Sequence, residues 1–325
     1  LSIKERCFQK GGNLLASLRG EGNAIALDQI STASLGTVTP QLDLTIHWQP
    51  QGALMVKSDA DGIAVDILPL VSAQNGNTTF VIPGSSIKGA LRSQAERIMR
   101  TVLSTHQIVD GFNDQVEVPM VTEIFGKSPR KDVPGNIGLL YIEDCYAKLS
   151  MKADEWEKVR ASKESSDLRK NLDDLAILNV ANAKLKHTQQ AFHVAIDRWT
   201  GGAADNFLYS NLEPMNVDWE PIQISLKLPQ RNESELKSYL ALLFLLIRDL
   251  QSDRIPLGYG VNRGMGAIAI SNIKLTGSGL DTLLPSLNFP LDLQGGNTAD
   301  LGQEVLQQLT SAWQAKIIQL QQEAN

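Results

Sequence analysis

The segment that most constrains the fold is residues 81–93, with the sequence VIPGSSIKGALRS. Pro83 and Gly84 break the preceding chain, and Ser85 or Ser86 is placed to cap a helix that begins here. After the serines, apolar residues recur at helical spacing, which predicts a helix with one buried face.

A glycine–serine turn that opens a helix presents unpaired backbone N–H groups and the positive end of the helix dipole, which together favour an anion. Lys88 and Arg92 are four residues apart and add positive charge on one face of this helix. The pattern is not a nucleotide-binding P-loop, because no Gly-Lys-Ser/Thr closes it. The same residues are equally typical of a capped helix with two surface bases, so both interpretations stay open.

The other regular segments give an α+β fold. In chain order we predict a strand at 42–48, the helix after Gly84, a strand at 139–142, a strand at 222–228, a helix from Asn232 with a capping-box-like Glu235, and a strand at 267–270. The order βαββαβ is that of a ferredoxin-like core.

Composition excludes several classes of protein. The chain has 325 residues, of which 42% are apolar, and 30 Lys and Arg against 36 Asp and Glu give a formal charge of −6. These values exclude wholesale disorder and a general basic coat, so any nucleic acid must meet local basic patches. Two cysteines, Cys7 and Cys145, make no disulfide framework and fit a reducing cytoplasm. The longest apolar run, 239–247, is too short to span a membrane.

The chain divides into parts by composition. We predict a leader or linker at residues 1–40, a core domain at 41–276 and a helical C-terminal tail at 277–325. Within the core domain, 148–186 is dense in both signs of charge and predicts a helical insertion, and 187–213 predicts a hairpin.

Two further segments are ambiguous by themselves. The glycine-rich stretch GYGVNRGMG at 258–266 leads into a strand, so it is not a dinucleotide fingerprint and is most simply a turn. The loop with Asp59, Asp61 and Asp66 lacks the spacing of an EF-hand. Asp66 differs from the other two because Val65 and Ile67 flank it, so it is either a structural partner or an acid placed at a site.

Four segments, taken in order, resemble the RAMP superfamily of CRISPR-associated proteins. They are IPGSSIKGALRS at 82–93, IFG at 124–126 with the strand that ends at Glu143 and Asp144, IDRWTGGAADNFLY at 196–209, and LGYGVNRGMG at 257–266. The resemblance is strongest to the repeated backbone subunit of type III effector complexes, the Cas-seven group.

The resemblance implies a modified ferredoxin-like core, related to the RNA-recognition fold, with a protruding thumb hairpin. Such subunits stack along a CRISPR RNA beside other effector subunits in antiviral defence, and the thumb displaces a base of the guide–target duplex. In type III complexes an aspartate beside that base cleaves the target RNA with Mg²⁺ or another divalent metal. The chain would then be an endoribonuclease, a hydrolase within a ribonucleoprotein complex. Because residues 1–40 precede the first core strand and 277–325 follow the last, we expect one repeat of a fused subunit.

Matched position by position, the resemblance makes Asp66 the catalytic residue and a metal ligand, with Asp59 and Asp61 as further candidates. The expected RNA contacts are Ser85, Ser86, Lys88 and Arg92, then Arg198 at the base of the thumb, and Asn262 and Arg263 in the glycine-rich stretch.

Three alternatives stay open. A catalytically inert guide-RNA-binding module would carry Asp66 for structural reasons. A CRISPR RNA-processing endonuclease of the same superfamily would depend on a histidine, here His187 or His193. An unrelated α+β protein would bind no RNA at moderate salt.

Overall fold

The computed structural model describes residues 39–59, 61–74, 76–104, 117–129, 134–175, 188–215, 217–229 and 231–323. The predicted leader, 1–40, lies outside this range except for its last two residues, and so do His187 and the end of the charged insertion. The description below concerns the unit from Thr39 onward.

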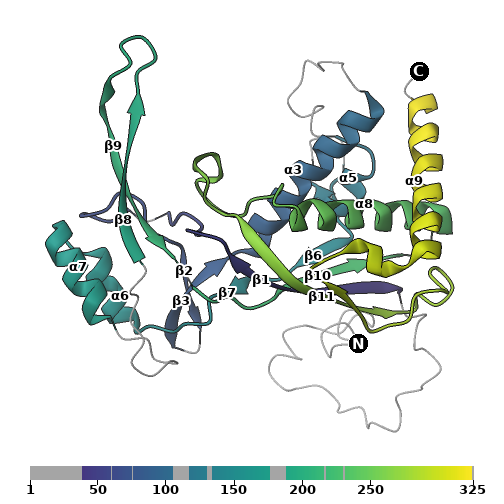
Figure 1. The fold of residues 1–325 in the computed structure, drawn as a ribbon, viewed down its shortest axis with the longest axis horizontal. Coiled ribbons are helices and arrows are strands. Elements are labelled where there is room, and N and C mark those ends of the chain that lie inside the picture. Colours follow the sequence, from purple (N-terminus) through teal and green to yellow (C-terminus); the bar gives the residue numbers. More distant parts are fainter. Residues whose placement is uncertain are drawn as a thin grey trace, which may run out of the picture. The chain divides into compact units, whose positions relative to one another are not determined.

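The largest sheet has five strands in the order β12–β11–β1–β10–β6, and every neighbouring pair is antiparallel (Figure 1). The strands are β1 (Gln41–Pro50), β6 (Leu140–Ile142), β10 (Ile222–Lys227), β11 (Ile268–Ser278) and β12 (Leu291–Gln294). In β1 the even-numbered residues from Leu42 to Trp48 are buried, which is the period-two pattern of a half-buried strand. The four predicted strands are confirmed, and the last continues to Ser278.

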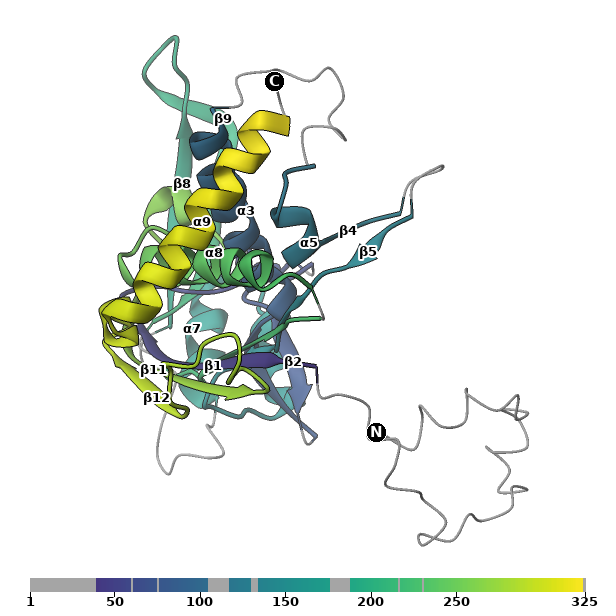
Figure 2. The same ribbon diagram turned by 90° about the vertical axis from the view of Figure 1, so that its right-hand side faces the viewer.

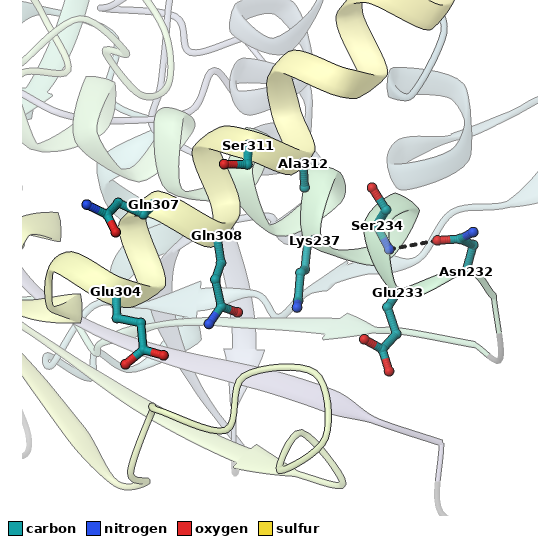
Figure 3. A pocket seen from close by; sticks show the side chains of 9 residues that line it. All are labelled: Asn232, Glu233, Ser234, Lys237, Glu304, Gln307, Gln308, Ser311 and Ala312. Atoms are coloured by element: carbon teal, nitrogen blue, oxygen red, sulfur yellow. Dashed lines mark hydrogen bonds between the residues drawn. The ribbon is translucent and has the colours of Figure 1, made fainter.

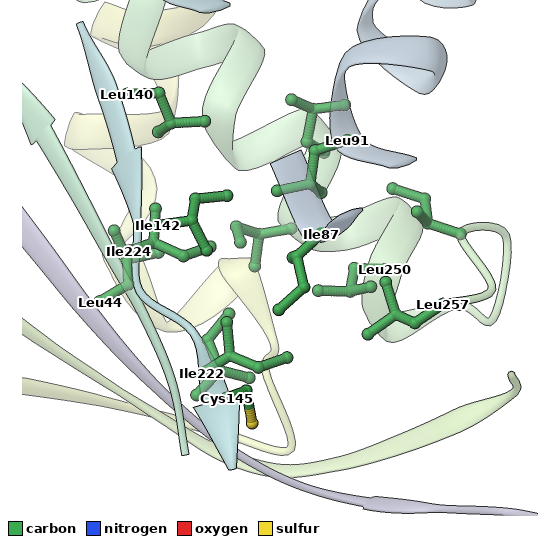
Figure 4. Close-up of a cluster of buried hydrophobic side chains, with 14 of the residues drawn as sticks. Leu44, Ile87, Leu91, Leu140, Ile142, Cys145, Ile222, Ile224, Leu250 and Leu257 are labelled. Atoms are coloured by element: carbon green, nitrogen blue, oxygen red, sulfur yellow. The ribbon is translucent and has the colours of Figure 1, made fainter. Parts of the chain in front are cut away.

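Two helices, α3 (Gly84–Leu103) and α8 (Glu233–Gln251), cover one face of this sheet, and α9 (Gln303–Glu323) packs against α8 (Figures 1 and 2). The core lies between the layers. Leu44 and Ile224 of the sheet meet Ile87 and Leu91 of α3 and Leu250 of α8 (Figure 4). The elements of these two layers follow one another as strand, helix, strand, strand, helix, strand, and the fold is α+β.

The start of α3 corrects the predicted serine cap. The helix begins at Gly84, before either serine. Pro83 occupies the N-cap position, and its side chain makes no capping hydrogen bond. The Gly84 N–H donates instead to Oδ1 of Asp144 at 2.8 Å. The partner therefore comes from the loop after β6, and the serines are left free of the capping role.

The ends of the other helices follow local chemistry. Asn232 caps α8 as predicted, because its side chain accepts a hydrogen bond from the Ser234 N–H at 2.8 Å. Glu235 does not complete a capping box and accepts from the Tyr239 hydroxyl at 2.6 Å. In the predicted C-terminal tail the last helix, α9, starts at Gln303. Gly302 adopts a φ of +86° and separates this helix from a short 3₁₀ turn.

The predicted helical insertion is confirmed in its described part, as α6 (Ala153–Arg160) and α7 (Ser165–Asp174). The insertion also packs on the core, because the buried Trp156 meets Phe80 edge to face with ring centroids 5.5 Å apart. Phe80 belongs to a three-stranded sheet of β2 (Val71–Gln74), β3 (Asn77–Ile82) and β7 (Cys145–Tyr146).

The predicted hairpin is confirmed as β8 (Thr188–Ile196) and β9 (Ala203–Pro214), a pair of long strands that stand away from the main sheet (Figure 1). We call the end formed by residues 188–190 and 212–214 its root, and residues 197–202 its tip. The remaining short elements are α5 (Val121–Phe125), β4 (Gly126–Lys127), β5 (Asn136–Ile137), η3 (Val261–Arg263) and η4 (Thr298–Leu301).

Candidate nucleic-acid interface

The loop that carries Asp66 is bonded to β9 near the root of the hairpin. The Ile67 N–H donates to the Ser210 carbonyl oxygen at 3.0 Å, and the Leu212 N–H donates to the Ile67 carbonyl oxygen at 2.9 Å. Ile67 thereby forms a short parallel bridge with Asn211. This pairing fixes the loop beside the hairpin, although Asp66 and Ser210 are 144 residues apart in sequence.

The carboxylate of Asp66 is held at one oxygen. Its Oδ2 accepts a hydrogen bond from the Ser210 N–H at 2.7 Å and another from the Ser210 hydroxyl at 3.1 Å. Asp66 is exposed, whereas its neighbours Val65 and Ile67 are buried. The apolar neighbours anchor the loop in the core while the carboxylate faces solvent.

The donor set at this loop limits the metal chemistry. Within the described ranges, no three or more His, Cys, Asp and Glu side chains are grouped so that they could hold a metal ion. Asp59 and Asp61 are exposed on the same loop as Asp66. A lone carboxylate suits an ion such as Mg²⁺, which keeps several waters and takes further ligands from a substrate phosphate. Among the described residues, Asp66 could therefore take part in holding a cation only if other ligands came from waters and a bound molecule.

The opposite face of the hairpin carries a polar cluster around the buried Glu213. Its carboxylate lies 3.3 Å from Nε2 of His193 and accepts hydrogen bonds from the side-chain amides of Gln189 and Asn211 at 3.4 and 3.5 Å. The His193 ring stacks on Tyr209 with centroids 5.4 Å apart. These contacts fix β8 against β9 on the face away from Ser210.

The glycine-rich stretch joins this cluster through Arg263. Its guanidinium lies over the rings of Tyr259 and Tyr209, 4.9 and 5.4 Å from their centroids, and donates to the Tyr209 hydroxyl. Burial lowers the pKa of Arg263, but the hydrogen bond with Tyr259 and the nearby charges outweigh burial and raise that pKa. Arg263 thus ties the loop to the hairpin, while the neighbouring Asn262 is exposed.

The glycines of this stretch allow close approach of two backbones. A Cβ atom at Gly258 would lie 2.2 Å from the Met55 carbonyl oxygen, and one at Gly266 would lie 2.1 Å from the Leu257 carbonyl oxygen. Both glycines have positive φ, +84° and +86°. Backbone hydrogen bonds from the Tyr259 and Gly266 N–H groups to the carbonyl oxygens of Met55 and Ala53, at 2.7 and 3.1 Å, hold the stretch against residues 53–55.

The predicted bases of α3 make intramolecular contacts. Lys88 Nζ donates to the Leu140 carbonyl oxygen at 2.7 Å, and Arg92 donates to Glu96 at 2.9 Å and to the Gly126 carbonyl oxygen at 2.8 Å. Burial, and then the charge of Arg92, lowers the pKa of Lys88. Both bases therefore lie on the flank of α3 that faces β6 and α5.

The other flank of α3 borders a groove of about 440 Å³. On the helix side it is lined by Ser86, Gly89, Ser93 and Arg97, and on the loop side by residues from Arg254 to Val261. Gln94, also in its wall, donates to the buried Asp249 at 2.7 Å, and Asp249 pairs with Arg254 at 3.2 Å. We call this hollow the α3 groove, and it joins two of the segments singled out in the sequence.

The family is decided by comparison of sequences. The sequence model of the RAMP superfamily matches residues 69–269, from just before β2 to the start of β11. The chain belongs to the RAMP superfamily. This membership suggests a CRISPR-associated RNA-binding module, and the superfamily includes some ribonucleases. Asp66 lies three residues before the matched range. A search of curated proteins gives no match.

The tip of the hairpin in this RAMP protein corrects one predicted position. Arg198 lies in the tip and not at the base of the hairpin, and it is exposed. Asp197 builds the turn, because its side chain accepts from the Trp199 N–H at 2.9 Å and from the Thr200 hydroxyl at 3.1 Å. Trp199 is 97% exposed. Strand β8 ends at Ile196 and strand β9 begins at Ala203, so Arg198 lies at the far end of the hairpin from its root.

A larger hollow of about 750 Å³ lies between the start of α8 and α9 (Figure 3). Its lining is polar and of mixed charge, as Glu233, Lys237 and Glu304 show. It contains none of the predicted RNA-binding residues of the RAMP protein.

No helix in the described part of the chain is both long and apolar enough to cross a membrane.

Neither Ser210 nor Arg97 of the RAMP protein is among the residues singled out from the sequence. Ser210, which holds Asp66, has no readable signal because its partner is remote in sequence. Arg97 does have a signal in the sequence, because it follows Ser86 and Ser93 at helical spacing and so lies on the same flank of α3.

Proposed function

We propose that the chain is a CRISPR RNA-binding backbone subunit of a cytoplasmic type III effector complex, of the Cas-seven group, and that it cleaves guide-complementary RNA with Asp66. The single observation that carries this proposal is the placement of Asp66. An exposed carboxylate, anchored at one oxygen, lies beside a long protruding hairpin in a RAMP protein. CRISPR RNA, target RNA and neighbouring effector subunits are the proposed partners, and one repeat of a fused subunit is the proposed context.

The sheet supports a ferredoxin-like core. Numbering the four strands of the βαββαβ order along the chain, β11–β1–β10–β6 reads fourth, first, third, second, and α3 and α8 are the two helices that connect within each half. The fifth strand, β12, is added at the β11 edge. The hairpin β8–β9 leaves this core between β6 and β10, as a thumb does in the proposed family.

The face of the hairpin that holds Asp66 continues outward as an apolar surface. Phe192 is paired with Ser210, and Val194 with Leu208, so these side chains share one face. Phe192, Val194 and Leu208 are exposed by 63%, 43% and 67%. Exposed aromatic and aliphatic side chains of this kind can support an unpaired base, which is the RNA conformation that cleavage beside a displaced base needs.

The proposed chemistry requires few catalytic groups from the protein, because the RNA supplies its own nucleophile. The 2′-hydroxyl of the RNA attacks the adjacent phosphorus and the bond to the 5′-oxygen breaks, which leaves a 2′,3′-cyclic phosphate on one fragment. Asp66 accepts the hydroxyl proton as a general base, and water supplies the proton that the leaving 5′-oxygen takes up. A bound Mg²⁺ would supply charge stabilisation at the phosphate, with Asp66 as its ligand from this chain. Guide pairing gives specificity, so the protein contributes shape and backbone contacts. Local positive charge, such as Arg97 and Arg254 at the α3 groove, serves this purpose in a chain of net charge −6.

The test is target-RNA cleavage by the assembled complex with Mg²⁺, comparing wild type with Asp66→Ala. We expect a loss of at least about 100-fold in the single-turnover rate, with unchanged target binding. Asp281→Ala is the matched control, since it removes an exposed acid that follows β11 and belongs to none of the predicted sites. Unchanged cleavage by Asp66→Ala would refute the enzymatic part of the proposal.

A second candidate function is an inert RNA-binding module. The two hydrogen bonds from Ser210 are also what a purely structural Asp66 would accept. A complex that binds target RNA tightly and does not cut it, with or without the Asp66→Ala change, would establish this function.

A further inference from the structure

Ser210 makes a set of hydrogen bonds that determine where its hydroxyl proton points. The hydroxyl oxygen accepts from the Asp66 N–H at 3.4 Å and from Nε2 of Gln190 at 3.4 Å. With both acceptor positions used, the single proton is directed to Oδ2 of Asp66 at 3.1 Å. Ser210 is only 3% exposed, so water does not compete freely for this proton.

Gln190 supports the same arrangement from the other strand. Its Nε2 also donates to the Ala64 carbonyl oxygen at 2.7 Å, two residues before Asp66. The loop and both hairpin strands are therefore connected around one hydroxyl.

We infer that Ser210 is a positioning residue for Asp66: its hydroxyl and N–H hold Oδ2 and turn Oδ1 toward the RNA. The inference rests on the proposed function, because it assigns Ser210 a part in the reaction of Asp66. Among the described residues, the hydrogen bonds to the Asp66 carboxylate go to Oδ2 alone. Oδ1 is therefore the oxygen that meets the 2′-hydroxyl or a cation.

The placement of Ser210 also links the hairpin to the reaction. Ser210 lies two residues from the exposed Leu208 and opposite the exposed Phe192. RNA that binds to this apolar face would contact β9, the strand whose Ser210 holds the Asp66 carboxylate. The position of the bound RNA and the orientation of the Asp66 carboxylate thus depend on the same strand.

The experiment compares Ser210→Ala, Ser210→Thr and Asp66→Ala in the assembled complex, with single-turnover cleavage at saturating target and separate measurement of the target Kd. In Ser210→Ala the backbone N–H and the bridge at Ile67 remain, so the loop keeps its place. A hydrogen bond to a charged group at a partly exposed site corresponds to about a 10-fold fall in rate, and the Kd stays unchanged. Ser210→Thr retains the hydroxyl and is expected to recover most of the rate.

The matched control is Ser225→Ala, which removes a serine hydroxyl bonded to Asp43 at 2.5 Å within the main sheet. It is expected to cleave at the wild-type rate. A wild-type rate in Ser210→Ala, or a Ser210→Thr complex as slow as Ser210→Ala, would overturn the assignment. If Asp66→Ala cleaves at the wild-type rate, the proposed function fails and the role of Ser210 fails with it. If Asp66→Ala is inactive and Ser210→Ala cleaves at the wild-type rate, only the role of Ser210 fails.

Discussion

Two glycines of α3 give the sharpest test of the fold, because alanine should have opposite effects at the two positions. A Cβ atom at Gly84 would lie 2.1 Å from the Ile142 carbonyl oxygen and 2.9 Å from that of Glu143. These neighbours are backbone atoms of a buried strand end, so they cannot move aside cheaply. A Cβ atom at Gly89 would meet no heavy atom of the described residues within 4 Å.

The magnitudes follow from these distances. Overpacking against backbone costs about 1–3 kcal/mol, and displacing the helix start also weakens the bond from the Gly84 N–H to the exposed Asp144, worth about 1 kcal/mol. Gly84→Ala should therefore lower the free energy of unfolding by about 3 kcal/mol. Gly89→Ala should raise it by about 0.5–1 kcal/mol, because alanine is the better residue inside a helix.

The assay is urea unfolding of the full chain, followed by circular dichroism at equal protein concentration. We expect the Gly84→Ala midpoint to fall by about 1 M and the Gly89→Ala midpoint to stay equal or rise. Two variants with the same midpoint, whether high or low, would contradict the reasoning, since both place one methyl group on the same helix.

Two further predictions concern titrating groups. Burial, and then the charge of Arg92, lowers the pKa of Lys88, so the unfolded chain holds this proton to higher pH than the folded protein does. The folded protein should therefore gain stability as pH rises toward the ordinary lysine pKa, and urea unfolding above about pH 8 should show a smaller gain in Lys88→Met. Burial, followed by the charge of Glu220, raises the pKa of Cys145 to about 12. We expect iodoacetamide at about pH 8 to modify Cys145 only after unfolding, by peptide mass spectrometry, and equal labelling of the native protein would contradict this.

The regular elements were predictable where one local signal decides them. The alternation in β1 and the helical spacing after Gly84 are burial patterns that the sequence displays directly. Asn232 caps α8 because its partner, the Ser234 N–H, is two residues away. Local rules of this kind succeed when both partners lie within one turn.

The wrong predictions concern contacts between residues that are far apart in the sequence, or positions that depend on strand length. Asp144 replaces the predicted serine cap from 60 residues away, and no local pattern announces it. Arg198 was placed at the base of the hairpin because a motif gives the order of residues but not the length of the strands around it. The bond between Ser210 and Asp66 spans 144 residues and depends on the whole tertiary fold.

Gly89 illustrates where fold and function separate within one helix. Gly84 is explained by packing, since no other side chain fits against β6. Gly89 has no such reason, and by helix propensity alone an alanine would be the more stable choice. It lies in the wall of the α3 groove, between Ser86 and Ser93 and across from Arg254. A bare backbone at that place lets a ligand approach the helix closely, with serine hydroxyls and arginines around it, which is the environment that suits a phosphate chain. Under the proposed function, Gly89 therefore marks the place where we expect the RNA backbone to approach α3.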